Sequence, residues 1–284
     1  MMEHATEFSS VFDLRDLFPS SRLVRMLPRS RKAQRQLEKV YRLFDDILRH
    51  HEERRAAGEA EQEQNMIDVL LRIQKAGGAM GASLTPGIIK SMVMDVFGAA
   101  VDTQAISLQW AMAELIANPR VMKKAQLEIR RVLAGQERVN EADLRDLHYL
   151  RAVIKENLRL HPPTSLVARV CLQEDQKVQQ YDVPHGTIVV TNVSAISRFE
   201  GKCAFDFKGS DYEYMPFGAG RRICPGITFT QANIEIALAN LLYHFNWELP
   251  PGLQPEDVDM TEVFGITVKR KSELLLHPVP WIPE

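Results

Sequence analysis

Apolar residues recur every three or four positions over most of the chain, as they do on the buried face of an amphipathic helix. This spacing predicts helices over residues 30–55, 66–74, 85–117, 120–133, 143–147 and 150–160, and another that begins at residue 227. Thr85 and Pro86 supply an N-cap followed by proline at the first helical position, and Asn118-Pro119 ends that helix. The pattern therefore predicts a helix-rich chain.

The pattern changes between residues 164 and 193, where apolar residues alternate with polar ones and with turns such as Pro184-His-Gly. We predict short strands there, and a hairpin formed by residues 265–269 and 274–277 near the C-terminus. No internal repeat is evident in the sequence. The expected fold class is mainly α with a small β-sheet, an α+β arrangement.

Composition changes this picture little. The 284 residues are 45% hydrophobic and 25% charged with a net charge of −2, so no basic excess favours nucleic-acid binding. The N-terminus lacks the apolar core of a signal or anchor, and no uncharged apolar stretch is long enough to predict a transmembrane helix. Cys171, Cys203 and Cys224 are odd in number and widely spaced, which favours a reducing compartment over a disulfide framework or a zinc site.

One of these cysteines lies in a glycine-rich, basic segment, Phe217-Gly-Ala-Gly-Arg-Arg-Ile-Cys-Pro-Gly226, just before the last predicted helix. A thiolate at this place gains from the positive N-terminal end of the helix. Gly218 and Gly220 allow tight turns and a close approach to a flat ligand, Arg222 can pair with a carboxylate, and Phe217 can cover an apolar face. These groups suit a haem. The alternative is an unligated cysteine in a loop near an anion site.

The pattern Phe-x-x-Gly-x-Arg-x-Cys-x-Gly closely resembles the cysteine loop of the cytochromes P-450, the haem-thiolate monooxygenases. The resemblance runs from about residue 8 to residue 280 and is closest to the plant A-type branch. It implies a haem b whose iron is ligated by Cys224, with Phe217, Gly218, Arg222 and Gly226 forming its surroundings. Arg169 occupies a place that resembles a second propionate-binding arginine; the alternative is a surface arginine at a strand edge.

A carboxylate and a guanidinium at Glu156 and Arg159 are spaced i, i+3 on one face of the helix at 150–160. By themselves they could form an exposed ion pair. Their segment, residues 150–163, resembles the Glu-x-x-Arg helix of the family. That resemblance implies a buried pair behind the haem, tied to a third arginine for which Arg198 is a candidate.

Asp102 and Thr103 stand in the middle of the apolar helix at 85–117, where an acid followed by an alcohol disfavours the helix. They could simply satisfy each other near the surface. The segment resembles the family's oxygen-binding helix, which implies that Asp102 and Thr103 help to deliver protons to bound oxygen. Ala100 replaces the usual glycine and narrows the space beside the helix, and Gln104 replaces a second hydroxyl residue.

Three functions follow as hypotheses. The first is a monooxygenase of secondary metabolism that inserts one oxygen atom from O2 into a small lipophilic molecule, with electrons from an NADPH-dependent reductase. The second is a haem-thiolate rearrangement enzyme without external electrons, against which the retained Asp102 and Thr103 argue. The third is a truncated, non-catalytic fragment: a partial cytochrome P-450 domain (1–284) that lacks the N-terminal half of the family's fold, retains the motifs and binds haem poorly or not at all. The family suggests the cytosolic face of the endoplasmic reticulum.

Overall fold

The computed structural model describes residues 21–26, 31–58, 65–78, 83–174, 176–198 and 211–282. The chain divides into two compact units, residues 1–102 and 103–284. The boundary falls inside the longest helix, α6 (Pro86–Ala117), which contributes one part to each unit. Cys203 lies outside the described residues.

The first unit is helical. It contains α3 (Arg22–Met26), α4 (Arg31–Ala56), α5 (Met66–Lys75) and the first part of α6. The predicted helices at 30–55 and 66–74 correspond to α4 and α5. Their apolar faces meet in a small core of the following buried side chains: Phe44, Leu48, Leu70, Leu71, Ile89 and Val93. At the start of α6, the Thr85 hydroxyl accepts the backbone N–H of Ile88 (3.3 Å), as the N-cap motif predicts.

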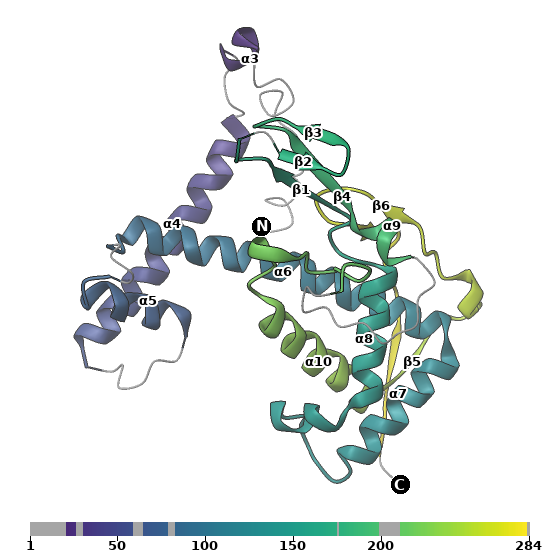
Figure 1. Ribbon diagram of the computed structural model, residues 1–284. Helices are drawn as coiled ribbons and strands as arrows, with labels where there is room; N and C mark the ends of the chain where they lie inside the picture. Colours follow the sequence, from purple (N-terminus) through teal and green to yellow (C-terminus); the bar gives the residue numbers. More distant parts are fainter. Residues whose placement is uncertain are drawn as a thin grey trace. The chain divides into compact units, whose positions relative to one another are not determined.

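The second unit contains three longer helices that lie side by side, α7 (Pro119–Val132), α8 (His148–Leu160) and α10 (Ile227–His244) (Figure 1). Shorter helical segments lie between them, η1 (Glu141–Asp146), α9 (Val193–Ser197) and η2 (Gly220–Arg222), and η3 (Pro255–Asp257) follows α10. The predicted helices at 120–133, 150–160 and from residue 227 are confirmed. The short helix expected at 143–147 is the 3-10 helix η1.

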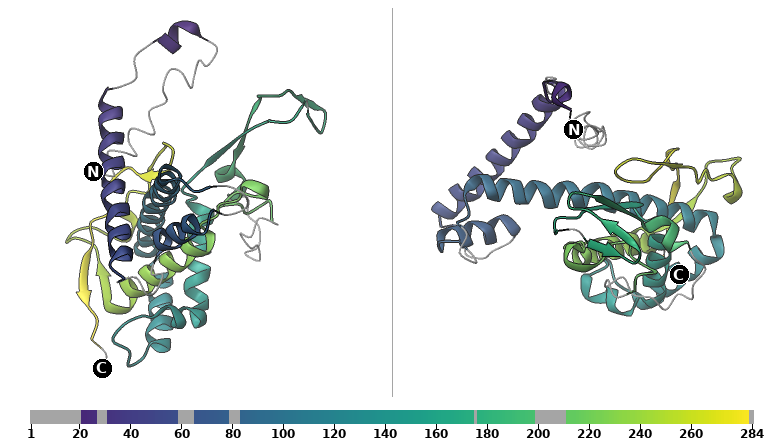
Figure 2. Two further views of the ribbon diagram at one scale, coloured as in Figure 1. Left: turned by 90° about the vertical axis from the view of Figure 1, so that its left-hand side faces the viewer. Right: turned by 45° about the horizontal axis from the view of Figure 1, so that its top comes forward.

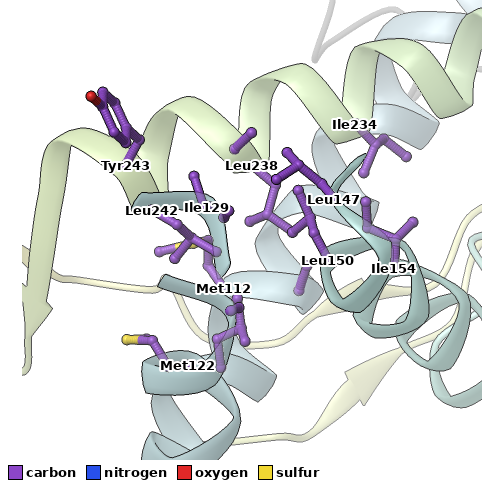
Figure 3. Packing of buried hydrophobic residues seen from close by; sticks show 14 of the residues in the cluster. Met112, Met122, Ile129, Leu147, Leu150, Ile154, Ile234, Leu238, Leu242 and Tyr243 are labelled. Atoms are coloured by element: carbon purple, nitrogen blue, oxygen red, sulfur yellow. The ribbon is translucent and has the colours of Figure 1, made fainter. Parts of the chain in front are cut away.

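The core of this unit lies where the apolar faces of α7, α8, α10 and the end of α6 meet. Figure 3 shows Leu238 and Leu242 of α10 pointing toward Ile129 of α7 and Leu150 of α8. These four side chains are fully excluded from solvent. Each such burial contributes about 1.5–3 kcal/mol, so the core fixes the position of α10 and of the loop that precedes it.

The strands form four small antiparallel pairs. β1 (Leu166–Val170) pairs with β4 (Ile188–Asn192), and β2 (Gln176–Val178) pairs with β3 (Tyr181–Val183). The β1–β4 ribbon carries β2 and β3 at its far end (Figure 2, left). β5 (Phe245–Glu248) pairs with β8 (His277–Pro280), and β6 (Glu262–Val263) with β7 (Lys269–Arg270). The expected α+β fold class, mainly α with small sheets, is confirmed.

The expected hairpin between residues 265–269 and 274–277 is wrong. His277 belongs to β8, whose partner is β5, the strand that directly follows α10. Lys269 belongs to β7, whose partner is β6. Leu274 and Leu276 pack against the core of the second unit, so core packing decided the pairing and not proximity in the sequence.

None of the described helices combines the length and the apolar character needed to cross a membrane.

Candidate functional site

The segment around Cys224 is a tight loop closed by backbone contacts. Gly218 and Gly220 both have a φ of 72°, a left-handed conformation that side chains other than glycine rarely adopt. The backbone N–H of Cys224 donates to the carbonyl oxygen of Phe217 (3.0 Å), and this bond closes the loop that contains both glycines. The two glycines thus let the chain fold back and present Cys224 beside Phe217.

The thiol of Cys224 lies close to the start of α10, which begins at Ile227. A Cβ placed on Gly226 would lie 3.8 Å from both Cys224 Sγ and Thr230 Oγ1, an ordinary contact distance, so residue 226 lies beside both the sulfur and the first turn of α10. Cys224 is half-buried. The unpaired N–H groups at a helix start favour negative charge nearby, which suits a thiolate ligand.

Arg169 of β1 reaches the same loop. Its Nη2 donates to the carbonyl oxygen of Arg222 (3.1 Å), and its Nη1 donates to that of Ala168 (2.9 Å). A Cβ on Gly218 would lie 3.9 Å from Arg169 Nη2. Arg169 and Arg222 are both exposed, so one guanidinium is hydrogen-bonded to the cysteine loop and a second arginine belongs to the loop itself. Sequence separation alone gave no reason to place them together.

Tyr214 also holds this loop, and no sequence pattern pointed to it. Its side chain is buried, and its hydroxyl donates to the carbonyl oxygen of Lys155 on α8 (2.7 Å). The segment that enters the cysteine loop is therefore tied to α8. Tyr214 belongs to no recognisable sequence motif, so its contact with α8 could not be predicted from the sequence.

Asp102 is the last residue of the first unit and Thr103 is the first residue of the second. Both lie on α6 and are half-exposed. The carbonyl oxygen of Thr103 accepts the hydroxyl of Ser107 (2.9 Å). The next residue, Gln104, has a contact that the sequence did not predict: its Oε1 accepts from Asn233 Nδ2 on α10 (3.2 Å). The amide at this position therefore links α6 to the helix that follows the cysteine loop.

Glu156 and Arg159 form a bidentate ion pair on α8. Arg159 Nε and Nη2 donate to the two carboxylate oxygens at 2.8 and 2.7 Å, and its Nη1 donates to the carbonyl oxygen of Ser197 (2.9 Å). Hydrogen bonding by Arg159 holds the pKa of Glu156 below its ordinary value, although burial opposes this. Arg159 thereby joins α8 to the end of α9.

Two expectations about this pair require correction. The side chains of Arg159 and Glu156 are 26% and 42% exposed, so the pair is partly solvated and not buried. Arg198, the candidate third arginine, forms its ion pair with Glu262 (3.1 Å). Arg198 follows directly after the end of α9 at Ser197, and there its guanidinium meets the carboxylate of Glu262 in β6.

Replacing Arg159 with alanine is expected to lower the free energy of unfolding by about 1–3 kcal/mol, because two charge-assisted hydrogen bonds and the Ser197 contact are lost while water screens the remaining charge. The folded-state pKa of Glu156 is depressed, so the pair stabilises above the unfolded-state pKa of about 4.5 and loses its effect as the pH falls through the folded-state value. Urea unfolding at pH 7 and at pH 3–4 measures both effects.

Arg49→Ala is the matched control, because Arg49 and Asp46 form an i, i+3 pair at 2.7 Å whose side chains are 67% and 64% exposed. We expect a change below about 0.5 kcal/mol there. Equal effects of the two substitutions would contradict a structural role for the Glu156–Arg159 pair.

The amino-acid sequence matches the family model described as Cytochrome P450 over residues 1–277. Among similar proteins, desmethyl-deoxy-podophyllotoxin synthase of Sinopodophyllum hexandrum is 41% identical over 98% of this chain and 58% of its own length. Premnaspirodiene oxygenase of Hyoscyamus muticus is 40% identical over 96% of this chain and 58% of its own length. The chain thus spans a little more than half the length of these relatives.

Solved structures show the same fold. The haem domain of cytochrome P450DA superposes with a TM-score of 0.74 at 21% identity, covering 89% of this chain and 57% of that one. A zebra fish cytochrome P450 with abiraterone gives a TM-score of 0.75 at 21% identity, covering 89% of this chain and 62% of its own.

Proposed function

Because this chain belongs to the cytochrome P450 family, we propose that it forms the cysteine-ligand part of a haem-thiolate monooxygenase acting on a small lipophilic metabolite. The observation that carries this proposal is the closed loop that presents Cys224 at the start of α10, with the Arg169 guanidinium hydrogen-bonded to that loop. In the overall reaction, substrate, O2, two electrons and two protons give the hydroxylated product and water.

The residues present fit a haem b. Cys224 supplies a sulfur ligand, and Gly226 lies beside that sulfur at the start of α10. Arg169 and Arg222 supply cations for the two propionates, and Phe217 supplies apolar cover. When bound, a haem with a thiolate ligand supplies an iron centre that favours O–O cleavage.

We extend the proposal to proton delivery by Asp102 and Thr103. A carboxylate and a hydroxyl on consecutive helical residues can hold a proton and pass it on through a hydrogen bond, which is the ordinary task of a general acid. Thr103 lies one residue before Gln104, whose bond to Asn233 fixes this turn of α6 against α10. That link supports a defined position for the Thr103 hydroxyl.

Electrons would come from an NADPH-dependent reductase at the cytosolic face of the endoplasmic reticulum, as the family resemblance implies. For the substrate, two relatives give a starting class: premnaspirodiene oxygenase, and germacrene A hydroxylase of Tanacetum parthenium, which is 40% identical over 94% of this chain. Both are named for terpene hydrocarbons. We propose an apolar molecule of this kind.

The test is to purify the chain, add haem, and record the spectrum of the reduced, CO-bound form, followed by turnover with reductase, NADPH and a terpene panel. A thiolate-type Soret band with NADPH-dependent oxygenated product supports the proposal. Product without reductase or NADPH would indicate a rearrangement enzyme instead. A chain that takes up no haem would contradict the proposal for these residues.

Replacing Thr103 with alanine is expected to lower the yield of oxygenated product per NADPH consumed by at least about tenfold, because general acid–base groups contribute that much or more. Thr103→Ser is the control, since it keeps the hydroxyl, and it is expected to retain most of the yield. Product and NADPH are measured in the same reaction. An alanine variant with an unchanged ratio would exclude the hydroxyl from proton delivery.

A further inference from the structure

A cavity of about 530 Å³ lies beside the first turns of α10, the helix that follows the cysteine loop. Its wall is formed by η1, by Arg151 of α8, and by Thr228, Gln231 and Glu235 of α10. This volume lies in the range of ligand pockets, and charged groups of both signs line it, so water enters it readily. None of the groups assigned above to haem binding or proton delivery lines this cavity.

A second, much smaller space of about 10 Å³ borders some of the same side chains. Arg151, Gln231 and Glu235 line it as well, together with Phe217 of the cysteine loop. A space of this size is at the lower limit for a single water molecule. The three polar side chains, named here the Arg151 cluster, therefore border both the water-accessible cavity and the small space beside Phe217 of the cysteine loop.

Specific contacts hold the Arg151 cluster in place. Arg151 Nη2 donates to the carbonyl oxygens of Leu144 (2.5 Å) and Arg145 at the end of η1, and its Nε lies 3.7 Å from Glu235 Oε2. Gln231 Nε2 donates to Glu235 Oε1 (2.9 Å). One guanidinium thus joins η1, α8 and α10, the three elements that surround the cavity.

Burial of the Glu235 carboxyl disfavours its ionised form. Its side chain is 9% exposed, and burial raises its pKa, an effect that the hydrogen bond from Gln231 and the charge of Arg151 offset only in part. The ionised carboxylate is therefore less favourable in the folded chain than in water, and above its ordinary pKa it subtracts from stability. Because the ionised Glu235 carboxylate does not stabilise the fold, its burial beside Arg151 and Gln231 indicates a functional role.

We infer that the Arg151 cluster positions α10 against α8 and η1. It also keeps water in the open cavity from reaching the small space beside Phe217 of the cysteine loop. Its members are positioning residues: they act on Cys224 through α10 and Phe217. A drier surrounding preserves the bond between the Cys224 N–H and the Phe217 carbonyl, and hydration near a metal–thiolate controls its redox potential. The significance for the iron ligand rests on the proposed function.

The decisive experiment is hydrogen–deuterium exchange of the chain without haem, in Gln231→Ala and Glu235→Gln variants. Gln231→Ala removes the hydrogen-bond donor to Glu235, so the loop should open more often, and exchange in a peptide covering residues 215–226 should rise about 3- to 10-fold. Glu235→Gln keeps the shape of the side chain but removes the charge that faces Arg151, so exchange in the same peptide should rise as well. Global stability should not fall in this variant, because the penalty for burying the ionised carboxylate is removed too. The β1–β4 peptides, residues 166–192, should keep the wild-type rate.

Arg145→Ala is the control variant, because Arg145 lines the cavity with an exposed side chain but contributes only its backbone carbonyl to the cluster. It should leave exchange in residues 215–226 unchanged. An increase of equal size in all peptides would show a merely global loss of stability and would overturn the inference, as would unchanged exchange in both cluster variants.

A second measurement uses haem as the probe. In the cluster variants the fraction of reduced, CO-bound haem with thiolate ligation should fall relative to Arg145→Ala, and equal fractions would count against the inference. A wild-type chain that takes up no haem contradicts the proposed function, while the exchange experiment still decides whether the cluster protects the loop.

Discussion

Replacement of Cys224 by serine is expected to abolish the thiolate-type Soret band of the reduced, CO-bound chain. An alcohol is a poor substitute for a thiolate ligand, because it remains protonated at neutral pH and binds iron weakly. The backbone of the loop should survive the change, since Gly218 and Gly220 set its conformation and the residue 224 N–H still reaches the Phe217 carbonyl. Absorbance spectra of haem-loaded wild type and variant measure the effect.

Cys171→Ser is the matched control. Cys171 is also half-buried and its sulfur lies near backbone carbonyls of Gln173 and Val183, away from the cysteine loop in the sequence. The spectrum of this variant should equal that of wild type. A thiolate band that persists in Cys224→Ser, or that disappears in Cys171→Ser, would move the ligand assignment away from Cys224.

The second large effect is expected on stability from Trp110→Ala in α6. Trp110 is fully buried, stacks on the His161 ring at 3.9 Å, and donates its Nε1 to the carbonyl oxygen of Val268 (3.2 Å). His161 Nε2 in turn lies 2.7 Å from Glu114 Oε1 of the same helix. Removing the indole leaves a cavity and an unpaired buried carbonyl, so the free energy of unfolding should fall by about 3–5 kcal/mol.

Urea unfolding followed by circular dichroism measures this change. Trp110→Phe separates its causes, because it keeps the ring in the core and loses only the hydrogen bond, with an expected loss of about 1–3 kcal/mol. Leu127→Ala on α7 serves as the control, since Leu127 is 61% exposed and should change stability by less than about 0.5 kcal/mol. A Trp110→Ala variant as stable as Leu127→Ala would show that this contact does not hold α6 in the second unit.

Most helices could be predicted because their signals are local. The turn at Thr85-Pro86 and the break at Asn118-Pro119 fix the ends of α6 through capping and the missing proline N–H, which need no distant partner. The cysteine loop was recognisable for the same reason. Its conformation depends on glycines at set positions, and a helix follows at once.

Contacts between distant residues could not be read in this way. The C-terminal hairpin was predicted from two neighbouring apolar runs, yet β8 pairs with β5 about thirty residues earlier because Leu274 and Leu276 pack on the core. The Glu156–Arg159 pair was predicted from its spacing, but its exposure depends on which elements cover α8. The spacing of Glu156 and Arg159 in the sequence does not show which other elements shield the pair from solvent.

The sequence by itself therefore determined the helices, the left-handed glycines and the candidate ligand Cys224, because backbone sterics and helix periodicity act within a few residues. Only the tertiary structure decided that Arg169 lies against the cysteine loop, that Gln104 meets Asn233, and that Arg151 and Glu235 face each other across α8 and α10. Those contacts join residues far apart in the chain, and they form only when apolar faces pack into a common core and bring their elements together.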